Sequence, residues 1–204
     1  MRDDRQPEDR MLTPDEIVES EKVFQGSVVS LYVDTVRLGN GSQAVREKVT
    51  HPGAVAVVAE NEDGLILLIR QYRHAAGEVL WEIPAGKLEP DEEPIECARR
   101  ELAEETGYVP DRIQKVSSFY TAPGFASEVI HLFFAEGLSE STAHQDDDES
   151  IVLSKIPFET CIEMIQNGQI RDGKTIIGLL MYNMLRKQTP LKRESRIFPD
   201  TGGI

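Results

Sequence analysis

Apolar residues along this chain fall mostly in short continuous runs. The runs are GAVAVVA (53–59), GLILLIR (64–70), LWEI (80–83), KVSSFYTA (115–122) and EVIHLFFAEGL (128–138). Continuous apolar runs are typical of strands buried on both faces of a sheet, whereas strict alternation indicates one solvated face. We therefore predict an α/β fold in which helices cover the sheet above and below.

Two runs rich in β-branched residues precede these strands. VFQGSVVSLYVDTVRL (23–38) and QAVREKVTH (43–51) flank a Gly-Asn-Gly sequence at 39–41. Asn-Gly between such runs is a strong signal for a β-hairpin. We predict a small antiparallel sheet ahead of the main domain.

The C-terminal part of the chain predicts one more strand and two helices. IVLSKIP (151–157) has the composition of a strand, and helices are expected over about 157–168 and 173–187, the second with apolar residues along one face. The resulting domain order is a flexible N-terminus at 1–14, a β-sheet at 15–50, a main domain at 51–188 and a flexible tail at 189–204.

The charge balance excludes some classes of partner. The 204 residues include 22 Lys and Arg against 36 Asp and Glu, which gives a formal net charge of −14. Such a chain repels nucleic acids and anionic membranes at long range. No apolar run approaches the length of a bilayer-spanning helix, and the first twenty residues are too polar for a secretion signal. We expect no nucleic-acid or membrane partner and a cytoplasmic location.

The cysteines and histidines show no metal-ligand spacing. Cys97 and Cys161 lie far apart in the sequence, as suits packing residues of a reducing compartment, and the four histidines are scattered. We expect these residues to be structural or exposed.

The stretch GKLEPDEEPIECARRELAEETGY (86–108) crowds carboxylates onto one predicted helix. Acidic residues and Pro94 suit the first turn of a helix, and Gly107 suits its end. Glu101, Glu104 and Glu105, however, fall in the last two turns, where the helix dipole disfavours negative charge. They lie beside the expected core stripe of Ile95, Ala98 and Leu102.

Two interpretations of this carboxylate cluster remain at this stage. It is either a solvated acidic face or a site for a hard divalent cation, because Mg²⁺ prefers oxygen ligands and is commonly shared between carboxylates and substrate phosphates. A bound cation removes the repulsion between the three glutamates.

The wider spacing resembles the Nudix box, GX5EX7REUXEEXGU with U aliphatic. The fixed positions of that motif are matched by Gly86, Glu92, Arg100, Glu101, Glu104, Glu105 and Gly107, with Leu102 at the first U and Tyr108 departing at the last. The resemblance implies an α/β/α sandwich with a mixed sheet and an enzyme that hydrolyses a diphosphate linked to another group. It also implies metal ligation by Glu101, Glu104, Glu105 and the backbone carbonyl of Ala85, with Arg100 and Glu92 holding these carboxylates in place. The expected cofactor is Mg²⁺ or Mn²⁺, with two or three ions in each site.

A second stretch, FYTAPGFASE (119–128), resembles the ADP-ribose pyrophosphatase branch of that family, with Pro123 and Gly124 in the characteristic turn. A plain loop is the alternative. The similarity extends over roughly 20–187. It implies hydrolysis of ADP-ribose to AMP and ribose 5-phosphate.

In that branch the general base comes from an acidic loop beyond the box, here 146–149. Glu149, which would also bind metal, is the first choice and Asp147 the rival, because related loops carry glutamates where this chain has mostly aspartates. A simple solvated loop is the alternative to both.

The same resemblance implies residues that bind the substrate. Arg73 is expected near the phosphates or the sugar, Arg46 across a dimer, Phe24 against adenine and Glu128 on ribose hydroxyls. The alternatives are ion pairs or surface positions for the arginines and a core position for Phe24. Trp81 is interpreted as a core residue.

The predicted sheet at 15–50 is too small to bury much by itself, which indicates packing on a second subunit and a homodimer that exchanges this sheet. Two competing functions remain. One is a Nudix hydrolase for another nucleoside diphosphate sugar, such as GDP-mannose or ADP-glucose, or one of broad specificity. The other is a module that senses ADP-ribose without hydrolysing it, which the intact box disfavours.

Overall fold

A computed structural model describes residues 14–141 and 150–188 of the chain. The chain divides into two compact units, one formed by Met1–Gly53 and Tyr120–Val129 and the other by Ala54–Phe119 and Ile130–Ile204. The predicted flexible tails lie outside the described residues, except for Pro14. The predicted base loop at 146–149 also lies outside them.

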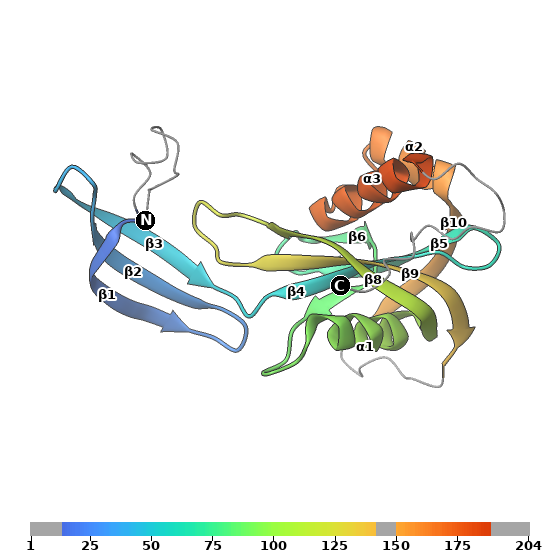
Figure 1. The fold of residues 1–204 in the computed structure, drawn as a ribbon, viewed down its shortest axis with the longest axis horizontal. Helices are drawn as coiled ribbons and strands as arrows, with labels where there is room; N and C mark the ends of the chain where they lie inside the picture. The colour runs from blue at the N-terminus through green and yellow to red at the C-terminus, as the bar shows by residue number, and fades with distance from the viewer. Residues whose placement is uncertain (1–13, 142–149, 189–204) are drawn as a thin grey trace, which may run out of the picture. The chain divides into compact units, whose positions relative to one another are not determined.

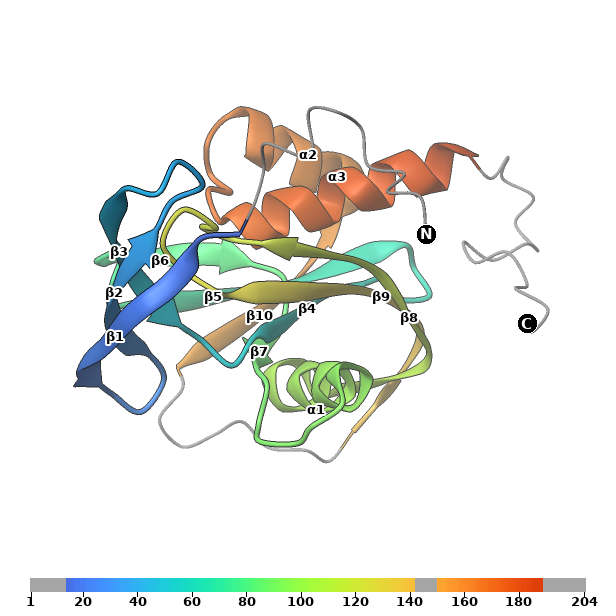
Figure 2. The ribbon, with the colours of Figure 1, turned by 60° about the vertical axis from the view of Figure 1, so that its left-hand side comes forward.

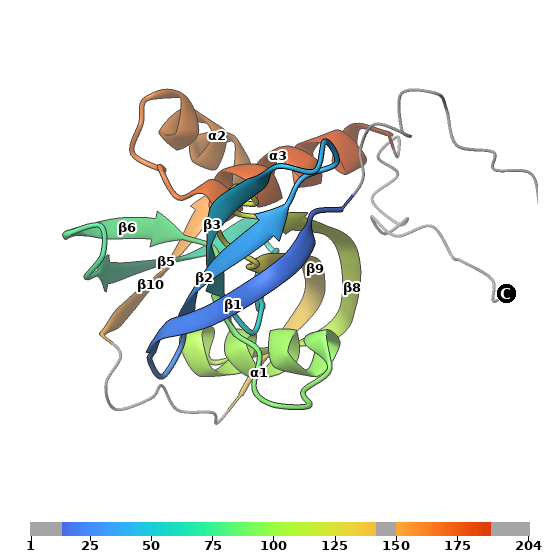
Figure 3. The ribbon, with the colours of Figure 1, turned by 90° about the vertical axis from the view of Figure 1, so that its left-hand side faces the viewer.

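The first unit is built on the antiparallel sheet that the sequence predicted. Strands β1 (Glu16–Gln25), β2 (Ser30–Arg37) and β3 (Gln43–Thr50) lie side by side in that order (Figure 3). Between β2 and β3 the chain turns at Gly41, whose φ of 84° suits glycine and whose N–H donates to the Leu38 carbonyl at 2.8 Å.

This small sheet buries few side chains. Every residue of β1 is exposed, and within β2 the buried side chains are Asp34 and Val36. Asp34 accepts hydrogen bonds at 2.5 Å from Ser20 and from Lys48. The Lys48 hydrogen bond lowers the pKa of Asp34, so the carboxylate stays charged in the middle of the sheet.

The segment 120–129 joins the same unit through β3. The Val49 N–H donates to the Phe125 carbonyl at 2.8 Å, and the Ser127 N–H donates to the Val49 carbonyl at 2.9 Å. These two bonds attach the predicted Pro-Gly turn to the N-terminal sheet.

The described residues of the second unit form two sheets and three helices. Its strands are β4 (Ala54–Ala59), β5 (Leu65–Arg73), β6 (Glu78–Glu82), β7 (Ala85–Lys87), β8 (Tyr108–Tyr120), β9 (Val129–Glu140) and β10 (Ile151–Pro157). They form sheets with the orders β10-β5-β6 and β7-β4-β9-β8. The second sheet is mixed, because β4 is parallel to β9 and antiparallel to β7.

The helices α1 (Pro94–Thr106), α2 (Phe158–Gln166) and α3 (Gly173–Gln188) cover opposite faces of these strands (Figures 1 and 2). One core cluster joins α1 to the strands through Ala98 and Leu102, and the other joins α2 and α3 through Cys161 and Leu179. The central strands are buried as the continuous apolar runs predicted, with all but the first residue of β4 inaccessible. The predicted α/β/α sandwich is confirmed.

Two core predictions have different outcomes. Trp81 packs against the α2 and α3 cluster while remaining partly exposed, with the Arg70 guanidinium 5.1 Å from its ring. Ile95 was expected in the core stripe, but 38% of its surface is exposed, so that prediction is wrong. It lies in the first turn of α1, before Cys97, the first buried residue of the helix. Among the described residues, no helix is both long and apolar enough to cross a bilayer.

Candidate active site

Helix α1 begins and ends where the sequence predicted. Pro94 occupies the first turn, following Glu93, whose ψ of 135° is extended. Gly107 ends the helix in the left-handed conformation with φ of 72°, and its N–H donates to the Ala103 carbonyl at 2.8 Å. These two ends place Glu101, Glu104 and Glu105 in the last two turns, and no basic residue accompanies them in the last turn.

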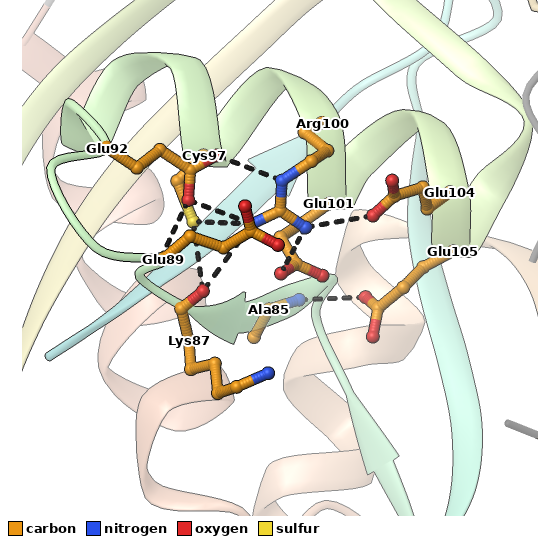
Figure 4. A network of polar contacts seen from close by, with 9 residues as sticks. All are labelled: Ala85, Lys87, Glu89, Glu92, Cys97, Arg100, Glu101, Glu104 and Glu105. Atoms are coloured by element: carbon orange, nitrogen blue, oxygen red, sulfur yellow. Dashed lines mark hydrogen bonds and ion pairs between the residues drawn. The ribbon is translucent and has the colours of Figure 1, made fainter. Parts of the chain in front are cut away.

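Arg100 contacts three carboxylates at once (Figure 4). Its Nε and Nη2 donate to the two oxygens of Glu92 at 2.9 and 3.0 Å, and its Nη1 donates to Glu101 at 2.8 Å and to Glu104 at 2.9 Å. The Glu92 hydrogen bond is the main cause that raises the pKa of Arg100, and the reciprocal bond lowers the pKa of Glu92 to about 2. Arg100 and Glu92 are therefore charged at neutral pH.

Glu105 connects the helix to strand β7. Its side chain is 3% exposed, and Oε2 accepts the N–H of Ala85 at 2.8 Å. Ala85 in turn pairs with Ala56 of β4 at the edge of the mixed sheet. This hydrogen bond joins the last turn of α1 to β7 and fixes the backbone of Ala85 beside the glutamates.

Gly86 leaves the space that Glu101 occupies. A Cβ atom at position 86 would lie 1.9 Å from Cδ and from Oε1 of Glu101, a distance that real side chains do not allow. Glycine is therefore needed here for close approach of the Glu101 carboxylate to the backbone of β7, and not for an unusual φ.

The donors gathered here have the chemistry of a hard divalent cation site. Glu101, Glu104 and Glu105 supply carboxylate oxygens, and Ala85 supplies a backbone carbonyl in the adjoining strand. As these side chains lie, Glu101 and Glu104 face Arg100 while Glu105 faces the Ala85 N–H. Consequently, no three His, Cys, Asp or Glu side chains within 14–141 and 150–188 converge in a way that could hold a metal ion. A cation at this site competes with Arg100 for the same oxygens.

Arg73 forms an ion pair. Its Nε and Nη2 each donate at 2.8 Å to one oxygen of Glu82, a side chain that is 1% exposed. Arg73 itself is 37% exposed, and the charge of Glu105 is one of the influences that raise its pKa. The guanidinium is thus held by Glu82, and its expected contact with substrate stays a prediction.

The other predicted substrate residues belong to the first unit. Phe24 is 56% exposed, so it is not a core residue of this chain. Arg46 lies 3.6 Å from Asp15 in an exposed ion pair. Glu128 accepts a hydrogen bond from Thr121 at 2.7 Å.

Pro123 and Gly124 form an exposed turn closed by the Phe125 N–H, which donates to the Ala122 carbonyl at 3.1 Å. The predicted base residues Glu149 and Asp147 lie in 142–149, outside the part of the chain that the structure describes.

The sequence analysis missed a polar network around Glu82. Lys174 contacts Glu82 and also lies 3.0 Å from Asp172, whose Oδ2 accepts the N–H and the hydroxyl of Thr175 at 2.9 and 2.6 Å. Two local signals were available: an acidic residue inside the apolar run LWEI, and an Asp three residues before Thr at the start of a helix.

Known proteins match the chain over most of its length. The family profile described as "NUDIX domain" matches residues 50–175. An ADP-ribose pyrophosphatase of Bacillus subtilis is 42% identical over 79% of this chain and 89% of its own length. A methanol dehydrogenase activator of Bacillus methanolicus is 42% identical over 90% of this chain and 98% of its own length. A GDP-mannose pyrophosphatase of Yersinia enterocolitica is 40% identical over 71% of this chain and 80% of its own length.

The fold has a counterpart among solved structures. The crystal structure of an ADP compounds hydrolase superposes with a TM-score of 0.77 at 20% identity, covering 88% of this chain and 98% of that one. With this fold, and with Gly86, Arg100 and the glutamates of α1 inside the matched segment, the chain belongs to the Nudix family of hydrolases.

Proposed function

We propose that this protein hydrolyses the diphosphate bond of ADP-ribose to give AMP and ribose 5-phosphate. The observation that carries the proposal is the arrangement around α1, where Arg100 gathers Glu92, Glu101 and Glu104 while Glu105 bonds to the Ala85 backbone. Support for the substrate comes from relatives named ADP-ribose pyrophosphatase at 42% and 36% identity.

Nudix hydrolases generally need divalent metal ions, and the donor set fits such an ion. We propose Mg²⁺, with Mn²⁺ as the alternative and two or three ions in each site, held by Glu101, Glu104, Glu105, the Ala85 carbonyl and Glu149. When bound, the metal neutralises the charge of the diphosphate and polarises its phosphorus–oxygen bonds.

The residues of the chain would divide the remaining work. Arg100 and Glu92 hold the glutamates in register. Glu149, or Asp147 in its place, accepts a proton from the attacking water as a phosphorus–oxygen bond forms and the bond to the bridging oxygen breaks. The bridging oxygen leaves with one phosphate as part of AMP or of ribose 5-phosphate, depending on which phosphorus is attacked.

Substrate selection falls to residues outside the Nudix box. We propose that Arg73 contacts the phosphates or the sugar, that Phe24 stacks on adenine, and that Arg46 and Glu128 contact the nucleotide and the ribose. The exposed turn at Pro123 and Gly124 would border this substrate. The exposure of Phe24 supports its part in the assignment, because an aromatic side chain in water is available for stacking.

The N-terminal sheet supports a homodimer. Its exposed apolar side chains, Ile17, Val18, Val23, Phe24, Val28 and Val45, are 43–63% accessible. A second copy of the chain that exchanges this sheet would cover them. We place the protein in the cytoplasm, in agreement with its two unpaired cysteines.

The main alternative is hydrolysis of another nucleoside diphosphate sugar. The 40% identity to a GDP-mannose pyrophosphatase favours this possibility specifically. A sensor that binds ADP-ribose without hydrolysing it is a weaker alternative, because every fixed position of the Nudix box is present in the sequence.

The test is product analysis in ¹⁸O-water with excess Mg²⁺. ADP-ribose, ADP-glucose, GDP-mannose and NADH are offered at equal concentration. We expect AMP and ribose 5-phosphate to form fastest from ADP-ribose, and the labelled product identifies the attacked phosphorus. Faster turnover of another sugar nucleotide would make that compound the substrate in place of ADP-ribose. No turnover of any of the four compounds would favour the sensor that binds ADP-ribose without hydrolysing it.

A further inference from the structure

A buried ionic network lies outside the Nudix motif and contacts Arg73. Glu82, at the end of β6, is bonded by Arg73 from β5 and by Lys174 from α3. Two cations therefore share one carboxylate that is 1% exposed. Asp172 supplies the second negative charge, 3.0 Å from Lys174, so the four groups are electrically balanced.

Glu82 is charged in this setting. Burial acts to raise its pKa, but the hydrogen bond from Arg73 and the charge of Lys174 outweigh burial and bring the pKa below its ordinary value. A buried charge of this kind is tolerated only with well-placed partners, and removal of one partner leaves the other uncompensated. The position of Arg73 therefore depends on Glu82.

The backbone that follows Glu82 is held at each residue up to the metal-binding loop. The Ile83 N–H donates to the Thr175 hydroxyl at 2.9 Å, the Pro84 carbonyl accepts the Val57 N–H at 2.8 Å, and the Ala85 N–H donates to Glu105 at 2.8 Å. Three residues thus connect the Glu82 network to the carboxylate cluster without a flexible joint.

Arg73 keeps one edge for another partner. The Nε and Nη2 atoms of Arg73 donate to Glu82. Among the described residues, Arg73 has no polar contact through Nη1. The side chain is 37% exposed, and the charge of Glu105 adds to the Glu82 hydrogen bond, the main cause that raises the pKa of Arg73. A planar guanidinium fixed along one edge is well suited to bind a phosphate oxygen along another.

We propose that Glu82 is a positioning residue that orients Arg73 to bind the anionic diphosphate of the substrate. The proposal rests on the proposed function, because it requires a diphosphate at the carboxylate cluster. Lys174, itself paired with Asp172, holds Glu82 from the first turn of α3, so the start of that helix contributes to substrate affinity without touching substrate. A purely structural ion pair, by contrast, would affect stability and leave affinity unchanged.

The test compares Glu82→Gln with Arg73→Met and with the double variant. We expect each single variant to raise KM for the best substrate by about tenfold or more while kcat changes by less than about threefold. The KM of the double variant should not exceed that of the single variant with the higher KM, because both substitutions act through one guanidinium. Multiplying effects, or loss of stability with an unchanged KM, would overturn the proposal.

A matched control lies on the same strand. Glu78 pairs with Arg171 in an exposed ion pair, and Glu78→Gln should leave KM unchanged. If Glu82→Gln folds poorly, Glu82→Gln combined with Lys174→Met removes one charge of each sign and keeps an acceptor for Arg73. That pair of substitutions should fold and should still show the raised KM, and a normal KM would count against the proposal.

Isothermal titration with ADP separates this proposal from the function on which it rests. If the wild type hydrolyses no sugar nucleotide, the proposed function fails, while the orienting role still predicts equal losses of ADP affinity in Glu82→Gln and Arg73→Met. An affinity equal to that of the wild type in Glu82→Gln, or no ADP binding by the wild type, overturns the positioning role as well.

Discussion

The second unit contains two ionic networks that differ in their balance of charge. In the first, Arg100 bonds to Glu92, Glu101 and Glu104, so three carboxylates share one guanidinium and the four groups carry a net charge of −2. In the second, Arg73 and Lys174 are matched by Glu82 and Asp172. One network has excess negative charge, and the other is balanced.

The two networks also differ in the burial of the group that their members share. Arg100, shared by the first network, is 28% exposed, whereas Glu82, shared by the second, is 1% exposed although its partner Arg73 is 37% exposed. Uncompensated charge is too costly to bury, so an excess of it is found where water or a cation can reach it. The comparison supports the proposal that the Arg100 network receives a cation, while the Glu82 network is electrically balanced and holds its residues in place.

The strongest challenge to this comparison is Glu105→Gln. We expect turnover to fall by roughly three orders of magnitude, because a charged metal ligand becomes neutral while the amide oxygen still accepts the Ala85 N–H. Steady-state kinetics at saturating Mg²⁺ measures the effect. Glu96→Gln, on the exposed face of the same helix, is the control. Near-normal turnover of Glu105→Gln would remove Glu105 from the metal site.

Gly86→Ala tests the position of Glu101 without changing any charge. The new methyl group would lie 1.9 Å from the Glu101 carboxylate, so this side chain must move. We expect roughly a hundredfold loss of kcat with only a small change in melting temperature. Gly173→Ala is a suitable control, because a Cβ there meets no atom within 4 Å. Equal activity of both variants would contradict the close approach.

Addition of Mg²⁺ should distinguish the two networks by stability. A cation that binds the folded state raises the melting temperature, and we expect a shift of about 5–11 °C at a hundredfold excess over Kd. Thermal unfolding of Glu101→Gln should show a much smaller shift, whereas Glu78→Gln should respond like the wild type. An equal shift in Glu101→Gln would place the bound cation elsewhere.

Acidification should weaken the Arg100 network. The pKa of Glu92 is about 2 in the folded protein and 4.5 ordinarily, so its stabilising contribution is present above pH 4.5 and is lost as the pH falls toward 2. The free energy of unfolding of the wild type should fall over this range more steeply than that of Glu92→Gln. Parallel curves for the two proteins would show that Glu92 contributes nothing through its charge.

The smallest effect is expected from Glu78→Gln. Its ion pair with Arg171 is exposed, and such pairs contribute about 0–1 kcal/mol. Chemical denaturation should show a change in the free energy of unfolding within that range. A loss above about 2 kcal/mol would mean that exposure is a poor guide to the importance of an ion pair in this protein.

Local signals explain which features were predictable. The ends of α1 depend on Pro94 and Gly107, and the N-terminal hairpin depends on the turn at 39–41, so sequence neighbours suffice. The register of the glutamates along α1 follows from helical periodicity. The sandwich follows from the continuous apolar runs.

Contacts between distant residues were not predictable in the same way. Glu82 and Lys174 are 92 positions apart, and their pairing requires the start of α3 to meet the end of β6. The sequence left two interpretations of Arg73 open, substrate contact or an ion pair, because its pairing with Glu82 depends on the β5–β6 register. Ile95 fits the periodicity of the core stripe, but its burial depends on where the packed strands end.

The burial of the two thiols has a practical consequence for labelling. Cys97 and Cys161 are both 0% exposed, and desolvation raises the pKa of each thiol to about 12. At neutral pH roughly one thiol in 10⁵ is then the reactive thiolate. A cysteine introduced at Met184, which is 62% exposed and lies outside the proposed dimer contact, would therefore react selectively with a maleimide, and a fluorophore or spin label can be attached without first replacing the native cysteines.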